Sequence, residues 1–209
     1  NLRLLAMDMD STLITIECID ELGSFANMKD RIAAITSQAM RGEIDYPESL
    51  RRRVALLAGL DEEVLQDVYE EKLRLSPGAE TLIERCKKNN IRLLLVSGGF
   101  SFFTGRLKQR PGFDDTLSNV LDVEGGKLTG RVLGTIVDAQ AKAAKFRQMA
   151  QRLGAAREQT VAIGDGANDL KMMAEAGTSI AWRAKPVVRA KATHALDYSG
   201  LDGVLNLFA

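Results

Sequence analysis

The chain has 209 residues, of which 45% are hydrophobic and 27% are charged, a composition typical of a globular protein with one substantial core. Its 28 basic and 28 acidic side chains cancel, so its charge does not indicate a nucleic-acid partner, and we recognise no membrane-spanning stretch or signal peptide. Cys18 and Cys86 lie far apart without metal-ligand spacing, which predicts free thiols in a cytoplasmic protein.

The chain opens with an apolar run at residues 2–7, interrupted only by Arg3, which predicts a buried strand. Asp8 and Asp10 follow it directly, and alternation along a strand places both on the same side. In parallel α/β sheets the reactive crevice lies outside the carboxyl ends of the strands. Two carboxylates this close repel each other, and a hard divalent cation such as Mg²⁺ removes that penalty. An ordinary turn with solvated acids is the alternative interpretation.

Helical spacing of apolar residues dominates the next part of the chain, from residue 17 to residue 72. Asp45 and Pro47 predict the start of one helix, and Asp61 that of another. A structureless connection of this length would be unusual, so we interpret residues 13–76 as an inserted helical cap over the crevice. Joined to the core only near 13–16 and 73–77, the cap is expected to hinge open for substrate.

From Pro77 onward, predicted helices and strands alternate, which is typical of an α/β fold. The predicted strands cover 91–96, 161–163, 179–182 and 193–196, and the predicted helices cover 77–89, 139–153, 168–176 and 201–208. Residues 117–133 predict a hairpin that turns at 124–127. We therefore expect a Rossmann-like parallel-sheet core, built from residues 1–12 and 77–209, with the helical cap at 13–76 and a β-hairpin flap at about 117–134.

We call Asp8 with Asp10 the first of four stations, that is, short motifs with reactive groups. The second and third stations carry groups that can bind a phosphate. Ser97, Gly98 and Gly99 follow the strand 91–96, where glycine lets the backbone approach an anion and a following helix start offers N–H groups. A plain strand-to-helix turn is the alternative. Lys142, near the start of the helix 139–153, can balance phosphoryl charge. Lys145 is equally basic, and the residues alone do not choose between the two lysines.

The fourth station is the segment 164–169, Gly-Asp-Gly-Ala-Asn-Asp, which follows the strand 161–163. Asp165 can complete a metal site, Asp169 can support it from behind, and Asn168 can donate to a phosphate or substrate. An acid-rich glycine turn is the alternative interpretation, but this segment is more specific than Ser-Gly-Gly, because most of its positions have a steric or ligand role.

Together the four stations can hydrolyse a phosphomonoester. A carboxylate is ionised near neutral pH and needs no base to attack phosphorus, which gives an acyl phosphate that water then cleaves. A divalent cation offsets the repulsion between the two anions. The leaving alkoxide needs a proton, and a second carboxyl group with a raised pKa can supply it.

With these stations in order, the chain resembles the haloacid dehalogenase superfamily. The matching motifs are DMDST at 8–12, SGG at 97–99, Lys142 and GDGANDL at 164–170. Within the superfamily it is similar to the phosphoserine phosphatase family. That similarity rests on ECIDELG at 17–23, MRGEIDYPESLRRRV at 40–54, VSGGFS at 96–101 and VDAQAKA at 137–143. The resemblance implies the haloacid dehalogenase fold and hydrolysis of phosphoserine, the last step of serine biosynthesis.

For the reaction, the resemblance implies that Asp8 is the nucleophile and that Asp10 is the general acid and then the general base. Mg²⁺ would be held by Asp8, the Asp10 backbone carbonyl and Asp165, with Asp169 supporting the site. The implied phosphate-binding residues are Ser97, Gly98 and Lys142.

For the substrate, the resemblance implies that Glu17 binds the ammonium group and Arg53 the carboxylate of phosphoserine, while Asn168 contacts the substrate from the core. A guanidinium is a two-pronged donor that matches a carboxylate. Without the resemblance, Arg51 and Arg52 are equally good candidates. The residues expected to line the closed apolar part of the pocket are Met40 and Tyr46.

Alternatives remain for the pocket edge, for the substrate and for the presence of catalysis. Tyr46 stands where the family commonly has Phe, which adds a hydroxyl at the pocket edge. The core is equally compatible with another small phosphomonoester, or with phosphoryl transfer to homoserine. A non-catalytic binding role is disfavoured, because a degenerate member is expected to have lost one of its acids. His194, the only histidine, is expected to have a structural or surface role.

Overall fold

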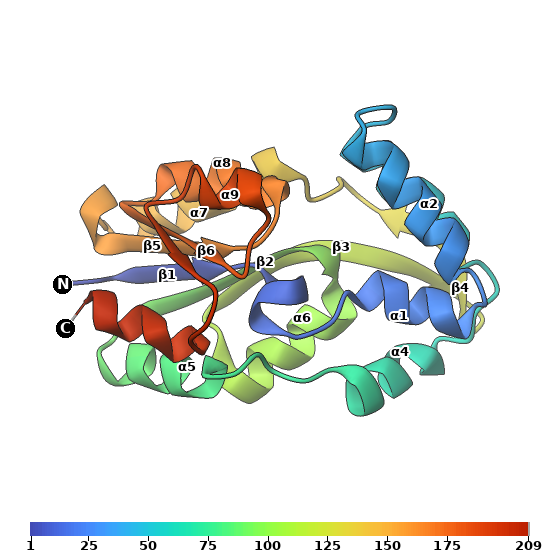
Figure 1. The fold of residues 1–209 in the computed structure, drawn as a ribbon. Helices are drawn as coiled ribbons and strands as arrows, with labels where there is room; N and C mark the ends of the chain where they lie inside the picture. The colour runs from blue at the N-terminus through green and yellow to red at the C-terminus, as the bar shows by residue number, and fades with distance from the viewer. Residues whose placement is uncertain (209) are drawn as a thin grey trace.

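The computed structural model describes residues 1–208, which form one seven-stranded sheet in the order β4-β3-β2-β1-β5-β6-β7 (Figure 1). The strands are β1 (Leu4–Met7), β2 (Arg92–Phe100), β3 (Asp115–Glu124), β4 (Lys127–Leu133), β5 (Thr160–Gly164), β6 (Thr178–Trp182) and β7 (His194–Leu196). All neighbouring pairs are parallel except β3 and β4, which form an antiparallel hairpin. The predicted α/β class, with its parallel core and β-hairpin, is confirmed.

β1 lies at the centre of the sheet because all four of its residues are apolar, and both of its edges are paired. Leu5 and Met7 pack into the core on one face, and Leu4 and Ala6 pack into a second cluster on the other. Both faces of β1 are therefore buried, which is typical of parallel sheets that have helices on both sides.

Helices lie on both faces of this sheet (Figure 1). One face carries α7 (Ala139–Arg152), α8 (Leu170–Glu175) and α9 (Pro186–Arg189), and the other carries α5 (Ala79–Lys88), α6 (Ser101–Leu107) and the closing 3₁₀ segment Leu201–Leu207. The predicted helices at 77–89 and 139–153 therefore form with small differences at their ends. The predicted last helix at 201–208 forms as a 3₁₀ segment instead of an α-helix.

The hairpin turn follows from two glycines. Gly125 and Gly126 have φ of 58° and 77°, a left-handed conformation that suits the tight two-residue turns of β-hairpins. The turn falls between β3 and β4, where the sequence predicts it.

One predicted strand is longer than expected. β2 does not end at Val96 but continues through Ser97, Gly98 and Gly99 to Phe100, so these residues are part of an irregular strand and not a turn. Its pairing with β3 shifts register between Val96 and Phe100. An irregularity of this kind releases backbone groups from the ladder, which frees them for other partners.

Residues between β1 and α5 form α1 (Cys18–Phe25), α2 (Lys29–Met40), α3 (Tyr46–Ala55), α4 (Glu63–Asp67) and a wide helical turn at Val68–Lys72. α3 starts as predicted, because the Asp45 carboxylate accepts a hydrogen bond from the Glu48 N–H at 2.8 Å and Pro47 lies in the first turn. In residues 1–208 there is no helix whose length and apolar character suffice to cross a bilayer.

The two chain segments that connect these helices to the sheet, near residues 14 and 75, lie side by side. Ile14 and Leu75 form an antiparallel bridge, and the Ser76 N–H donates to the Leu13 carbonyl at 2.8 Å.

The hairpin β3–β4 also contacts the helical region. The Gly59 N–H donates to the Leu128 carbonyl at 2.8 Å, and the Leu128 N–H donates to the Leu60 carbonyl at 2.9 Å, so the hairpin also holds the helical region.

Candidate active site

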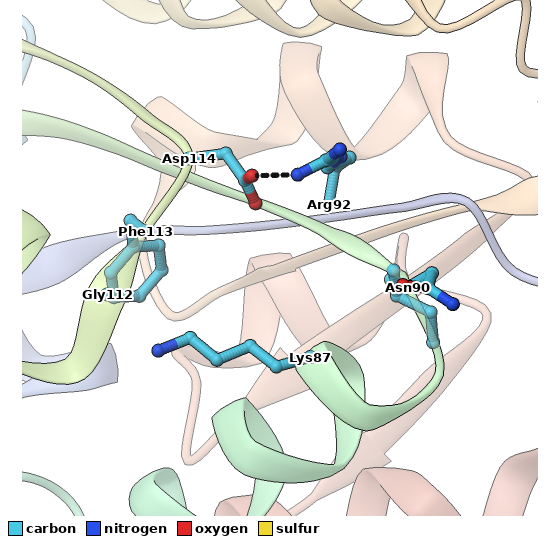
Figure 2. Close-up of a pocket in the computed structure, with 7 residues that line it drawn as sticks. Lys87, Asn90, Arg92, Gly112, Phe113 and Asp114 are labelled. Carbon is cyan, nitrogen blue, oxygen red and sulfur yellow. Dashed lines mark hydrogen bonds and ion pairs between the residues drawn. The ribbon is translucent and has the colours of Figure 1, made fainter.

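The acidic and basic groups of the four stations meet at the carboxyl ends of β1, β2 and β5. A second pocket lies at the opposite end of β2, where the basic side chains are already paired. Figure 2 shows a pocket there, in which Arg92 donates to Asp114 at 2.6 Å; Lys87 is also paired, with the Pro111 carbonyl. Both cations of that pocket already have protein partners.

Lys142 is the buried cation of the site. Its side chain is 0% exposed, and its Nζ lies 2.9 Å from Asp8 Oδ1 and 2.8 Å from Asp169 Oδ1. Burial alone would lower the pKa of this lysine, but the carboxylates of Asp169 and Asp8 overcome that effect and raise it, so Lys142 stays charged. Lys145 instead pairs with Asp115 at 2.7 Å, which resolves the choice that the sequence left open.

Asp8 directly follows β1, and its side chain points toward Lys142. It is 5% exposed, and its Oδ1 accepts a hydrogen bond from the Met9 N–H at 2.7 Å. Burial first, and then the neighbouring Asp169 carboxylate, raise the pKa of Asp8 well above its ordinary value, although Lys142 opposes this. The charge of Asp8 therefore depends on a nearby cation.

Asp10 faces a different set of partners. Its Oδ1 accepts from the Cys18 N–H at 2.9 Å, and its Oδ2 accepts from the Ser97 hydroxyl at 3.1 Å. Burial raises the pKa of Asp10, and the hydrogen bonds from Cys18 and Ser97 partly offset that increase. A carboxyl group in this environment can hold a proton nearer to neutral pH than a solvated aspartate.

Asp165 reaches the same place from the loop after β5. Thr12 donates to its Oδ1 at 3.0 Å, which ties the two loops together. Burial, followed by repulsion from Asp169, raises the pKa of Asp165 to about 6.

Carboxylate oxygens of Asp8, Asp165 and Asp169 lie within 4.8 Å of one another. Both oxygens of Asp169 are engaged, Oδ1 by Lys142 and Oδ2 by the Gly166 N–H at 3.1 Å. The contacts of Asp8 and Asp165 are through Oδ1, so these two residues have more capacity for an added ion. The donors are hard oxygens and carry excess negative charge, which suits a divalent metal cation.

The predicted substrate-binding residues come from the helical region and from the loop after β5. Glu17, at the start of α1, is exposed and accepts a hydrogen bond from the Ser11 hydroxyl. Partial shielding of the carboxylate from water, and then the Asp10 carboxylate, raise the pKa of Glu17 to about 7. Arg53 lies two turns after Tyr46 on the same side of α3, and its Nε donates to the Ser49 carbonyl at 3.3 Å.

Tyr46 reaches the core directly, because its hydroxyl donates to the Gly98 carbonyl at 3.2 Å. Asn168 is half-buried on the loop after β5. Met40, expected in the apolar part of the pocket, is 68% exposed at the end of α2.

Two residues of this region were missed by the sequence analysis. Thr12 lies inside the first motif, and its hydroxyl holds Asp165. Asn119 lies in β3, is 1% exposed, and donates to the Gly98 carbonyl at 2.7 Å. An asparagine between Leu117 and Leu121, which alternation places on the same side of the strand, is a signal for a buried polar contact, but the sequence does not indicate its partner.

Comparison with known proteins identifies the family of this chain. Residues 5–174 match the haloacid dehalogenase-like hydrolases, and the chain belongs to this family.

Several relatives are similar over nearly the whole chain. A phosphoserine phosphatase of Polaromonas sp. (strain JS666 / ATCC BAA-500) is 50% identical, with 98% of this chain and 89% of that protein covered. A solved phospho-aspartyl intermediate analogue of phosphoserine phosphatase has a TM-score of 0.92 at 36% identity, covering 99% of each chain. A substrate-bound phosphoserine phosphatase complex has a TM-score of 0.92 at 35% identity, covering 99% of this chain and 98% of that one.

Proposed function

We propose that this chain is a Mg²⁺-dependent phosphatase that hydrolyses phosphoserine to serine and phosphate. The observation that carries the proposal is the position of Asp8, a buried carboxylate beside a buried lysine and two further acids at the end of the central strand. The similar phosphoserine phosphatases support the choice of substrate. The same similarity supports a role in amino-acid biosynthesis, and the free thiols of Cys18 and Cys86 support a cytoplasmic location.

In this proposal Asp8 attacks phosphorus, and the oxygen of the serine side chain leaves. The Asp8–phosphorus bond forms as the ester bond breaks, and water then cleaves the aspartyl phosphate. Lys142 and the Ser97 hydroxyl balance the charge of the phosphoryl oxygens, together with backbone N–H groups near Gly98. Asp10 donates a proton to the leaving oxygen and then accepts one from the attacking water.

Asp8, the Asp10 carbonyl and Asp165 are the proposed Mg²⁺ ligands, and Asp169 holds Lys142 behind them. A bound Mg²⁺ supplies charge that lets the anionic nucleophile approach an anionic phosphate. The clustered carboxylate oxygens support this assignment because their unbalanced negative charge needs a cation.

The amino-acid part of the substrate is assigned to the helical region. Glu17 would bind the ammonium group, and that positive charge would keep the Glu17 carboxylate ionised in spite of its raised pKa. Arg53 would bind the substrate carboxylate, with Asn168 on the opposite side, and Met40 would join Tyr46 at the pocket when the helices close over it. Residues 13–76 would thus act as a cap domain on the core of residues 1–12 and 77–209.

A substrate panel with Mg²⁺ or with EDTA tests this proposal. We expect turnover of phosphoserine above that of phosphothreonine and sugar phosphates, and no turnover in EDTA. Phosphoserine hydrolysis that is unaffected by metal removal, or a preference for a sugar phosphate, would overturn it. Adding homoserine as an acceptor distinguishes hydrolysis from phosphoryl transfer.

The Glu17→Gln variant tests the assignment of the ammonium site. Its kcat/KM for phosphoserine should fall by about 10- to 100-fold, the effect of losing one hydrogen bond between charged groups. The same variant should hydrolyse p-nitrophenyl phosphate, which lacks an ammonium group, at nearly the wild-type rate. An equal loss for both esters would contradict the role of Glu17 in substrate choice.

A further inference from the structure

The peptide group between Gly98 and Gly99 is held at both of its polar ends. Its carbonyl accepts hydrogen bonds from the Tyr46 hydroxyl at 3.2 Å and from Asn119 Nδ2 at 2.7 Å. Its N–H donates to Ser97 Oγ at 2.8 Å. The orientation of this one peptide plane therefore determines what the Ser97 hydroxyl can do.

Asn119 lies where the ladder between β2 and β3 is interrupted. It is the β3 partner of Phe100, immediately after the register shift that begins at Val96. The irregular stretch turns the Gly98 carbonyl away from the ladder, and a buried carbonyl without a partner is costly. The Asn119 amide supplies that partner from a position that is 1% exposed.

The oxygen of the Asn119 side-chain amide contacts a second segment, the one that leads into α7. Its Oδ1 accepts a hydrogen bond from the Val137 N–H at 2.8 Å. Val137 precedes Asp138, whose carboxylate caps α7 through the Ala141 N–H at 2.8 Å. This helix carries Lys142, so one buried side chain links the Gly98 peptide to the start of the lysine-bearing helix.

We propose that Asn119 is a positioning residue that sets the phosphate-binding arrangement by fixing the Gly98–Gly99 peptide relative to the helix of Lys142. This inference rests on the proposed phosphatase function and deepens it.

The consequence for Ser97 follows from hydrogen-bond direction. A hydroxyl has one proton, and Ser97 Oγ already accepts from the Gly99 N–H. Its proton therefore points to the Asp10 side, where Oδ2 lies at 3.1 Å, and toward the place of the phosphate. Reversing the peptide plane would remove the Gly99 donor from Ser97 and aim a carbonyl oxygen into an anion site.

The variant Asn119→Asp tests this role with little change in side-chain shape. The carboxylate can still accept from Val137, but it presents an oxygen to the Gly98 carbonyl in place of the N–H donor. We expect kcat/KM for phosphoserine to fall on the order of 10²-fold, as displacement of a binding group by about 1 Å can cause. The inhibition constant for inorganic phosphate should weaken on the order of 10-fold.

Thr104→Val is the matched control. Thr104 is 1% exposed, and its hydroxyl shares a 2.7 Å hydrogen bond with Ser118, the residue before Asn119. This variant also loses one buried hydrogen bond next to β3, so its Tm should fall while the inhibition constant for phosphate stays at the wild-type value. A folded Asn119→Asp protein with kcat/KM and phosphate inhibition within about two-fold of wild type would overturn the inference.

If Asn119→Asp does not fold, Asn119→Ser is measured by the same criteria, since the shorter side chain leaves room for water between the two backbone groups. If the wild-type protein does not hydrolyse phosphoserine, the proposed substrate fails, but calorimetric binding of phosphate in the presence of Mg²⁺ still compares wild type with the Asn119 variant. Absence of phosphate binding by the wild type would overturn both proposals.

Discussion

The contact between Tyr46 and Gly98 gives a prediction that can be worked out from distances. A Cβ atom added at Gly98 would lie 2.2 Å from the Tyr46 hydroxyl oxygen and 3.2 Å from its Cζ, whereas ordinary contacts begin at 3.4 Å. Gly98→Ala must therefore move the tyrosine or the β2 backbone by about 1.2 Å, which we expect to lower kcat/KM on the order of 10²-fold.

A second substitution separates this steric cause from a general defect at Gly98. Tyr46→Phe removes the hydroxyl oxygen and leaves the 3.2 Å contact, which needs a shift of only a few tenths of an ångström. The double variant should therefore recover about 10-fold in kcat/KM relative to Gly98→Ala alone. Steady-state kinetics on phosphoserine measure both effects. Wild-type activity in Gly98→Ala, or no recovery in the double variant, would refute the reasoning.

Two further predictions concern the buried charges. Lys142→Met leaves the carboxylates of Asp8 and Asp169 without their cation and should lower the free energy of unfolding by about 3 kcal/mol and abolish turnover; denaturant unfolding measures the first effect. Lys145→Met, which breaks only the pair with Asp115, is the control and should cost less than about 1 kcal/mol with activity retained. The raised pKa of Asp165 means that the folded, metal-free protein binds a proton more tightly than the unfolded chain, so its stability should fall as pH rises from 3.8 to about 6. The loss is at most about 3 kcal/mol. Added Mg²⁺ should restore stability above that range, and metal-free unfolding energies that rise between these two pH values would contradict the assignment.

The parallel core was predictable because its signals are local. The apolar run at the start of the chain, the helix start at Asp45 and the Gly125-Gly126 turn each depend on neighbouring residues, and each appears in the structure. The acids after β1 and β5 were likewise predictable as a group, because parallel strands bring their carboxyl ends to one edge of the sheet.

The remaining features depend on contacts between distant parts of the chain. The glycine pair at 98–99 suggests a turn, and only the pairing of Phe100 with Asn119 shows that the strand continues. Lys142 and Lys145 are chemically equal until the packing of α7 buries one of them. The role of Asn119 was missed for the same reason, since both of its partners come from other segments.

The most direct test of the central claim is to trap the covalent intermediate. Acid quenching of the enzyme during turnover of phosphoserine, followed by peptide mass spectrometry, should detect a base-labile phosphoryl group on Asp8. No such group should form in Asp8→Asn, which should fold normally and be inactive. A phosphoryl group on another residue, or undiminished turnover by Asp8→Asn, would contradict the proposed chemistry.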